Sequence, residues 1–491
     1  MIKRSAGILL PIFSLPSPYG IGSLGAGARA FADFLHDAGQ SWWQILPVGP
    51  TGAGNSPYTS ASTFAGNPLF LDLEALAEDG LLDRADLAAA RLPAADKIDY
   101  DAVYAVREPL LRKAFSRLSG EKAQAVRTFA DNTPWLKEYA LFRAAKTRFQ
   151  GRAWYDWPDE ALRRHESAAV ERWRVELAED VAFHETVQYW FFTQWEALKK
   201  YVNALDIKII GDLPIYVSLD SSDVWAERRE FLLDSQGRPS KVAGVPPDYF
   251  SEDGQLWGNP LYDWKTMKQN GFGWWIRRVE GASKLFDAIR IDHFRGLESY
   301  WAVPAESETA KTGQWEKGPG MDLLRVLTSW FPQITYIAED LGLLTDAVHD
   351  LRNESGLPGM KVLEFAFSGP DNAYLPHNHQ KNCICYTGTH DNDTAVGWYA
   401  HAGKEERAFV ERYLGVSGAE DVRRALLRCG QGSVARLFVA QMQDYLGLGS
   451  EGRINVPGVA DGNWQWRLLP GQTAKALAKE IRELTHTFGR C

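Results

Sequence analysis

The apolar residues of the chain follow two alternating patterns. In the segments 28–39 and 185–205 they recur every three or four residues, as on the buried face of a helix. Each segment precedes a short continuous apolar run, 42–50 or 207–212, which is typical of a strand buried on both faces. Helix and strand therefore alternate along the chain. The two predicted helical faces comprise Phe31, Phe34, Leu35 and Ala38, and Val187, Phe191, Trp195, Leu198 and Val202.

Strand-like runs recur at 285–292, 334–342, 382–393 and 452–458, with helical patterns between several of them. Repeated βα units without a Gly-x-Gly-x-x-Gly fingerprint favour an α/β fold of the (β/α)8 TIM-barrel type over a dinucleotide-binding fold. Residues from about 73 to 180 carry charge-rich helical patterns, which predict a helical insertion. No repeat, low-complexity tract or linker divides the chain, so we expect residues 1–491 to form a single elaborated barrel.

Four of the strand-like runs end in charged side chains. One Arg-x-Asp triplet alone would be consistent with a structural ion pair. In a barrel, however, the carboxyl ends of all strands converge on one pocket, so four such endings predict a common site. Residues two apart on a strand project to the same face, which would bring the arginine and the aspartate of the triplet into that pocket together. The four endings are Asp212; Arg290 and Asp292; Glu339 and Asp340; and His390 and Asp391.

A pocket with several carboxylates, an arginine and a histidine could bind a hard metal ion or transfer a glycosyl group. Two loops, 55–68 and 244–262, are punctuated by Gly and Pro and rich in Tyr, Phe, Trp, Asn and Ser. Such loops suit stacking on sugar rings and bonding to their hydroxyls, although structural turns share this composition. The 19 tryptophans and the aromatic content of 12% also hint at carbohydrate.

Charge and cysteine content exclude several classes. The net charge is -9 and no run of like charges occurs, so a neutral substrate is favoured over nucleic acid. Four cysteines are too sparse for a disulfide framework, and Cys383 and Cys385 lie in a strand-like run where core packing is favoured over zinc binding. Neither a cleavable leader nor an apolar stretch of membrane-spanning length is evident. We therefore expect a soluble cytoplasmic protein without a membrane partner.

Long motifs in a fixed order carry a resemblance to a known family. They are the segments 7–25, 56–70 and 244–262, followed by "RIDHFRG" from Arg290, "AEDLG" from Ala338, "GTHDND" from Gly388 and "NVPG" from Asn455. Together they make the chain resemble the 4-α-glucanotransferases (amylomaltases or disproportionating enzymes), glycoside hydrolase family 77 of the α-amylase superfamily. The resemblance covers nearly the whole chain.

The resemblance implies transfer of a segment of an α-1,4-glucan to the 4-hydroxyl of another glucan or of glucose. The reaction would retain configuration through a covalent glycosyl-aspartate, without a cofactor. Asp292 then corresponds to the nucleophile, Glu339 to the general acid/base, and Asp391 to the carboxylate that steadies the distorted sugar. Arg290 would keep Asp292 ionised, and the carboxyl groups of Asp292 and Glu339 would lie ~5 Å apart.

The same resemblance implies a set of substrate-binding positions. His293 and His390 correspond to donors to sugar hydroxyls. The implied loop contacts are Ser56, Tyr58, Asp248, Tyr249, Phe250 and Trp257. The implied pocket-wall positions are Asp212, Asn455 and Pro457.

Two departures from typical α-amylases agree with this family. Those enzymes carry Asn and His four and five residues after the aspartate of their first motif, where this chain has Tyr216 and Val217. Gly296 stands where they place a histidine after the nucleophile. Calcium is therefore not expected. Three alternatives stay open at the level of sequence: a starch-degrading hydrolase with the same carboxylates, a non-catalytic glucan-binding protein and a metal-dependent sugar isomerase.

Overall fold

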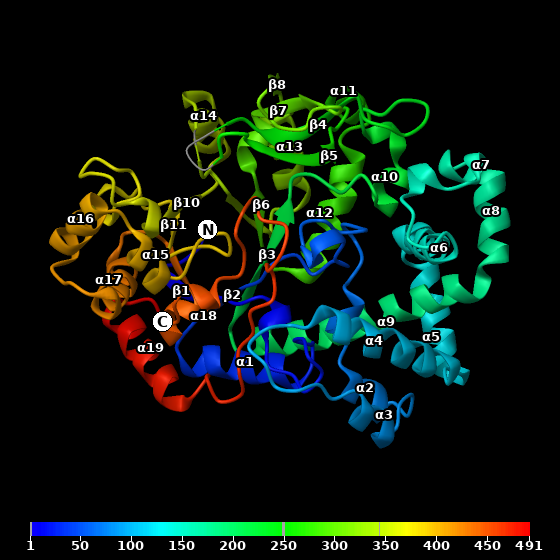
Figure 1. The fold of residues 1–491 in the computed structure, drawn as a ribbon, viewed down its shortest axis with the longest axis horizontal. Helices are drawn as coiled ribbons and strands as arrows, with labels where there is room; N and C mark the ends of the chain where they lie inside the picture. Colours follow the sequence, from blue (N-terminus) through cyan, green and yellow to red (C-terminus); the bar gives the residue numbers. More distant parts are fainter. Residues whose placement is uncertain (1, 248–250, 343) are drawn as a thin grey trace.

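A computed structural model describes residues 2–247, 251–342 and 344–491. Its centre is a sheet of eight strands in the order β10-β11-β12-β1-β2-β3-β6-β9, and every adjacent pair is parallel (Figure 1). The backbone N–H of Ala338, at the end of β9, donates to Pro358 O at 2.9 Å just before β10, which draws the two edges together. The predicted (β/α)8 barrel is confirmed. Its strands are β1 (Ser5–Leu9), β2 (Trp42–Gln44), β3 (Lys208–Pro214), β6 (Ala288–Asp292), β9 (Thr335–Ala338), β10 (Gly359–Val362), β11 (Cys383–Tyr386) and β12 (Leu437–Gln441).

Helices separate most of these strands along the chain and surround the barrel (Figure 1). Both periodic segments of the sequence are helical, as predicted, and the residues of the second face are buried. The helices around the barrel are α1 (Ala26–Asp37), α9 (Ala178–Ala204), α12 (Gly273–Leu285), α13 (Gly320–Trp330), α14 (Asp346–Ser355), α15 (Ala395–His401), α16 (Lys404–Leu414), α17 (Ala419–Gly432), α18 (Met442–Leu446) and α19 (Lys475–Thr487).

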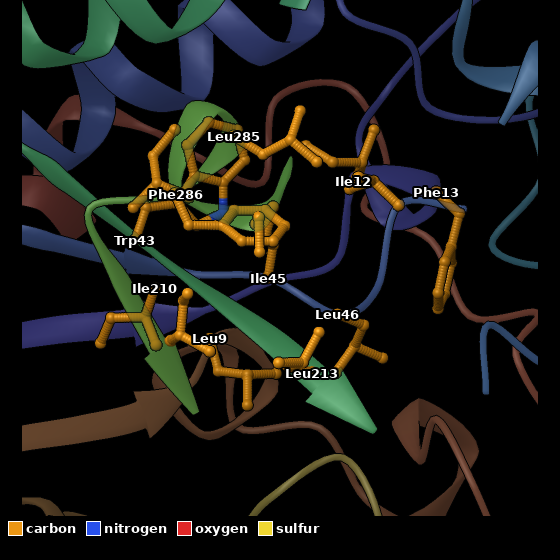
Figure 2. Packing of buried hydrophobic residues seen from close by; sticks show 14 of the residues in the cluster. Leu9, Ile12, Phe13, Trp43, Ile45, Leu46, Ile210, Leu213, Leu285 and Phe286 are labelled. Atoms are coloured by element: carbon orange, nitrogen blue, oxygen red, sulfur yellow. The ribbon is translucent and has the colours of Figure 1, made fainter. Parts of the chain in front are cut away.

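Side chains from strands and helices pack together in the layer between them (Figure 2). Trp43 of β2 meets Phe31 of α1 edge-on at 5.1 Å between ring centroids. Phe286, which follows α12, lies so close to β3 that a Cβ at Gly211 would be 2.1 Å from its ring, so this position requires glycine. Full burial of each such large side chain stabilises the fold by about 1.5–3 kcal/mol.

The predicted strand at 452–458 is wrong. This segment is irregular after a short 3-10 helix, and the strand that neighbours β1 is instead β12, whose residues are all buried. Val456 is 38% exposed; its N–H donates to Asn463 Oδ1 at 2.9 Å and the N–H of Asn455 donates to His390 O at 3.1 Å, so neither N–H bonds to a strand. The strands β1, β10 and β12 are four or five residues long, like β6, β9 and β11, but no charged side chain directly follows them to mark their carboxyl ends.

A second sheet, antiparallel in the order β5-β4-β7-β8, lies beside the barrel (Figure 1). Its strands are β4 (Lys241–Val245), β5 (Gln255–Pro260), β7 (Ser299–Pro304) and β8 (Gln314–Lys317), and the nearby helices are α10 (Ser222–Ala226) and α11 (Trp264–Gln269). The predicted active-site loop 244–262 therefore contains the end of β4 and all of β5, so it is in large part a hairpin.

Helices fill the connection between β2 and α9, and α5 to α8 lie together at one side of the molecule (Figure 1). They are α2 (Leu73–Glu78), α3 (Arg84–Ala89), α4 (Tyr100–Ser116), α5 (Gly120–Asp131), α6 (Pro134–Arg148), α7 (Glu160–Arg163) and α8 (Ser167–Glu176). We propose that this region is the helical insertion expected over 73–180, within one domain. Among the described residues, no helix combines the length and apolar character needed to cross a membrane.

Candidate active site

The register of β3 and β6 brings an arginine between two aspartates. Asp212 is paired with Arg290 across these strands, and Pro214 is paired with Asp292. Arg290 Nη1 lies 2.6 Å from Asp212 Oδ2 and 2.9 Å from Asp292 Oδ1. The side chains of Arg290 and Asp212 are 3% and 1% exposed, whereas that of Asp292 is 26% exposed. The buried ion pair therefore supports a third group, Asp292, that can still be reached from the cleft.

Glu339 enters the same region from β9. Ile291 is paired with Ala338, and the backbone N–H of Glu339 donates to Ile291 O at 3.1 Å, so Asp292 and Glu339 follow at the same level of neighbouring strands. His293 is left-handed (φ 53°), and its backbone N–H donates to Glu339 Oε2 at 2.7 Å. The N–H of Leu341 donates to Oε1 at 2.9 Å. Two backbone donors thus fix the orientation of this carboxyl group.

Burial and charge act in opposite directions on these acids. Burial raises the pKa of Asp292 well above its usual range; the surrounding carboxylates raise it further and Arg290 lowers it. Burial likewise raises the pKa of Glu339, against the effects of Arg290 and the two backbone donors. Arg290 acts on the pKa of Asp292 in the expected direction, but burial outweighs it. The two acids therefore retain a proton to higher pH than isolated carboxyl groups would.

The third carboxylate, Asp391, follows β11 and opens toward solvent, with its side chain 41% exposed. Asn455 Nδ2 donates to Asp391 Oδ1 at 2.6 Å. Arg453 donates from Nη2 to the backbone oxygen of Asp391 at 2.7 Å and from Nε to Asn455 O at 2.8 Å. The segment 453–455, wrongly predicted as a strand, is therefore a clamp that orients Asp391.

Tyr58 joins the loop 55–68 to the buried ion pair. Its hydroxyl donates to Asp212 Oδ2 at 2.6 Å, so His390 Nε2, 2.8 Å away, must donate to the tyrosine oxygen. The two rings stack at 5.2 Å with an interplanar angle of 16°. Burial lowers the pKa of His390 and raises that of Tyr58 well above its usual range, so both side chains are neutral near pH 7. Ser56 supports this arrangement locally, since its Oγ accepts from the N–H of Tyr58 at 3.2 Å.

An aromatic group covers the other side of the cleft. Trp257, on β5, is 38% exposed and meets the ring of His293 edge-on at 4.8 Å. Burial lowers the pKa of His293 to about 3, so its ring is neutral. Tyr216 packs beside Trp257 at 6.2 Å. The indole therefore sits directly beside the turn that follows Asp292.

The remaining predicted positions divide into two groups. Asp248, Tyr249 and Phe250 lie outside the described residues. Pro457 is exposed, and within the described residues no hydrogen bond or ring contact joins it to the acids. Asp340 also turns away from the cleft, because its oxygens accept from Arg352 at 2.6 Å and from the N–H of Met360 at 2.7 Å.

Sequence reasoning missed three contributors to the site. Arg453 was hidden in the misassigned strand. Trp464 packs on both Tyr58 and His390 at 5.8 and 5.9 Å, although it lies in no motif that we used. Tyr216 was noted only as a departure from the α-amylases. No local pattern marks these residues, since only the folded chain brings them to the cleft.

Besides the acids, the site contains a small cavity and no preformed metal cluster within the described residues. The cavity, of about 50 Å³, lies behind Tyr58 and Asp212 and is also bounded by Arg278. In the described part of the chain, no group of three His, Cys, Asp or Glu side chains is placed to hold a metal ion. Asp212, Asp292 and Arg290 instead satisfy one another's charge.

Comparison with known proteins identifies this arrangement. The family model described as 4-alpha-glucanotransferase matches residues 10–473. A 4-alpha-glucanotransferase of Thermus thermophilus is 48% identical over 502 residues, which cover 100% of this chain and 99% of the relative. One from Solanum tuberosum, described as chloroplastic/amyloplastic, is 44% identical over 99% of this chain and 87% of its own length.

Solved structures agree. An amylomaltase from Streptococcus agalactiae, in complex with acarbose, superposes with a TM-score of 0.97 at 37% identity, over 99% of this chain and 100% of that one. The amylomaltase from Corynebacterium glutamicum shares the fold, with a TM-score of 0.80 at 19% identity over 99% of this chain and 74% of that one. The resemblance in the sequence is confirmed: the chain belongs to the 4-alpha-glucanotransferase family of glycosyl-transferring enzymes.

Proposed function

We propose that the chain transfers segments of α-1,4-glucans by a retaining double displacement. In the first step a carboxylate oxygen of Asp292 attacks the anomeric carbon, and the bond to the leaving sugar breaks as Glu339 protonates the departing oxygen. In the second step Glu339 removes the proton from the 4-hydroxyl of an acceptor sugar, whose oxygen displaces Asp292. The number of α-1,4 bonds and the configuration at the anomeric carbon are both conserved.

The observation that carries this proposal is the contact of Arg290 with Asp292, at 2.9 Å, beside Glu339 on the neighbouring strand. Burial raises the pKa of both acids, so the pair retains a proton. Arg290 lowers the pKa of both acids, and two backbone N–H donors also lower that of Glu339. We assign the charge to Asp292 because Arg290 contacts this carboxylate directly at 2.9 Å. That is the protonation state a nucleophile and a general acid require. The assignment is a proposal for the pair as a whole, because the two acids titrate together.

We assign the surrounding polar groups to the sugar in the cleft. Asp391 is half-exposed; Asn455 holds its Oδ1, and its Oδ2 lies 3.3 Å from His390 Nε2, so the exposed carboxylate can accept from sugar hydroxyls beside His390. Trp257 offers an exposed indole on which the apolar face of a glucose ring can stack. The amylomaltase from Streptococcus agalactiae was solved with acarbose, which supports a glucan-like ligand here as well.

Trapping the intermediate tests the proposal. A 5-fluoro-α-glucosyl fluoride loses fluoride readily but yields a glycosyl-enzyme that resolves slowly. After incubation, intact-mass spectrometry should show one added fluoroglucosyl group, and peptide mapping should place it on Asp292. An adduct on another residue, or unchanged release of fluoride by Asp292→Asn, would show that Asp292 is not the nucleophile.

A further inference from the structure

A buried polar layer lies beneath the segment 387–395, which carries His390 and Asp391. Three neighbouring barrel strands contribute to it near their carboxyl ends: Glu364 lies two residues after β10, Gly388 two residues after β11, and Gln441 at the end of β12. A Cβ at Gly388 would lie 2.6 Å from Glu364 Oε1 and 2.7 Å from Gln441 Nε2. The acid and the amide therefore occupy the space under this glycine together.

Three residues of this layer hold the segment along its length, Glu364 through its backbone and Gln441 and Asp444 through their side chains. The backbone N–H of Glu364 donates to Thr387 O at 3.2 Å, at the start of the segment. Gln441 Nε2 donates to Asp393 O at 2.9 Å, two residues after Asp391. Asp444 accepts from the N–H of Ala395 at 2.8 Å. Movement of Glu364 or Gln441 would therefore displace the backbone that positions Asp391.

Two oxygen atoms in this layer lack a donor. Among the described residues, Glu364 Oε1 and Gln441 Oε1 are buried without a hydrogen-bond partner. Two buried acceptors left in this way would cost free energy, whereas a proton on Glu364 supplies the missing donor. The carboxylic acid can then donate to the amide oxygen, and the amide nitrogen remains bonded to Asp393.

The charges that face Glu364 also favour its neutral form. Burial raises the pKa of this carboxyl well above its usual range; Asp444 and Asp393 raise it further, Arg453 opposes them and Glu406, on α16, raises it again. A bound cation would be the alternative to a proton. In the described part of the chain, however, no three acidic, His or Cys side chains are close enough to hold one.

We propose that Glu364 is a positioning residue that works as a neutral acid, donating to Gln441 and so fixing the segment 387–395 with Asp391 at its centre. Glu364 does not touch the reacting atoms. The inference rests on the proposed role of Asp391, because that role makes the position of the segment matter for transfer.

Two substitutions test whether Glu364 acts as a neutral hydrogen-bond donor, as a charged group or only as a side chain that fills space. Glu364→Gln keeps the shape and a donor, so its kcat and KM for maltotriose transfer should stay within about twofold of wild type. Glu364→Ala should lower kcat by about tenfold or more, with a smaller change in KM, because Asp391 is displaced in the transition state. The control Glu230→Ala removes another buried carboxyl, bonded to Asn270 away from the cleft, and should lower Tm without lowering kcat.

A thermal readout keeps the proposal testable if Glu364→Ala does not fold. The unfolded chain ionises this group near pH ~4.3, while the folded chain keeps the proton. Wild type therefore loses stability as pH rises above that value, and Glu364→Gln does not, so the Tm of the variant relative to wild type should increase between pH 5 and pH 8.

The outcomes that overturn the proposal are distinct. A pH-independent difference in Tm between wild type and Glu364→Gln would mean that Glu364 is ionised. Equal losses of kcat in Glu364→Gln and Glu364→Ala, or full kcat in folded Glu364→Ala, would remove its positioning role. Near-normal transfer by Asp391→Asn would instead overturn the proposed role of Asp391. The pH dependence of Tm would still test whether Glu364 is protonated, independently of that role.

Discussion

At the scale of single residues, Arg290 organises the site. Burial of its guanidinium would ordinarily lower the pKa. Asp212 and Asp292 outweigh this effect and raise the pKa of Arg290 well above its usual range. One permanent cation thus makes it possible to keep several acids in a buried pocket. Because Tyr58 and His390 are neutral, the remaining negative charge in the cleft is concentrated on the carboxylates that the reaction uses.

The first prediction concerns replacement of the proposed nucleophile, Asp292. In Asp292→Asn the amide can still lie beside Arg290, but it cannot form a glycosyl ester. Transfer from maltotriose should fall on the order of 10³-fold or more, while the far-UV spectrum and glucan binding are kept. The measurement is product chromatography together with titration of a non-reacting oligosaccharide. Near-normal turnover would show that another group attacks the sugar.

Glu339→Gln separates proton donation from attack. The variant should lose about 10²–10⁴-fold with ordinary glucans, whose leaving oxygen needs a proton, and far less with an α-glucosyl fluoride. The pH dependence of kcat/KM provides a second test. Burial raises the pKa of Glu339, and a general acid works below its pKa, so the kcat/KM of wild type should fall as pH rises through that value. Glu339→Gln should lack this alkaline limb, and equal losses on both donors would exclude the role.

At the scale of elements, the sequence predicts those parts of the site that short local patterns encode. β3, β6, β9 and β11 each end an apolar run in a charge, and the barrel brings these ends together. The motif beginning at Asn455 named that residue through the family resemblance, but no local pattern predicts how Arg453 and Asn455 orient Asp391, because both bonds to Asp391 cross the folded chain. β12 is also hidden: it has five residues, like β6, but no charged side chain marks its carboxyl end, so its short apolar run does not separate a strand from a helix.

The hairpin at 244–262 has a prediction of its own. Trp257 stands beside His293 with its indole exposed, so Trp257→Ala should remove a stacking surface for sugar without disturbing the ion pairs. Loss of one such contact should raise KM by about 5- to 100-fold, equivalent to roughly 1–3 kcal/mol, with little change in Tm. The control is Trp330→Ala, which removes an exposed tryptophan at the end of α13. Equal KM values for the two variants would exclude Trp257 from sugar binding.

At the scale of the whole molecule, the two ends of the chain are bonded to each other beside β1. Arg490, after α19, donates to Ser5 O at 2.9 Å, at the start of β1, and to Gln431 O at 2.7 Å, in the last turn of α17. Arg4 in turn donates to Phe488 O at 3.0 Å. Two arginines thus join the start of the first strand to the segment that follows the last helix. The general barrel could be predicted from alternating patterns, but this connection could not, because its partners are separated by almost the full length of the sequence.

The whole molecule also decides between transfer and hydrolysis, which use the same carboxylates. We expect transfer, because the second sheet places β5 and Trp257 beside the acids, where they can shield the intermediate from water and orient an acceptor sugar. Maltotriose should then become a ladder of longer chains plus glucose, with the number of reducing ends nearly constant. Water attack would raise that number steadily. Reducing-end assay and chromatography of the same samples distinguish the two, and Trp257→Ala should increase the hydrolytic fraction. If wild type forms reducing ends as fast as it breaks glycosidic bonds, the family's catalytic site acts here as a hydrolase.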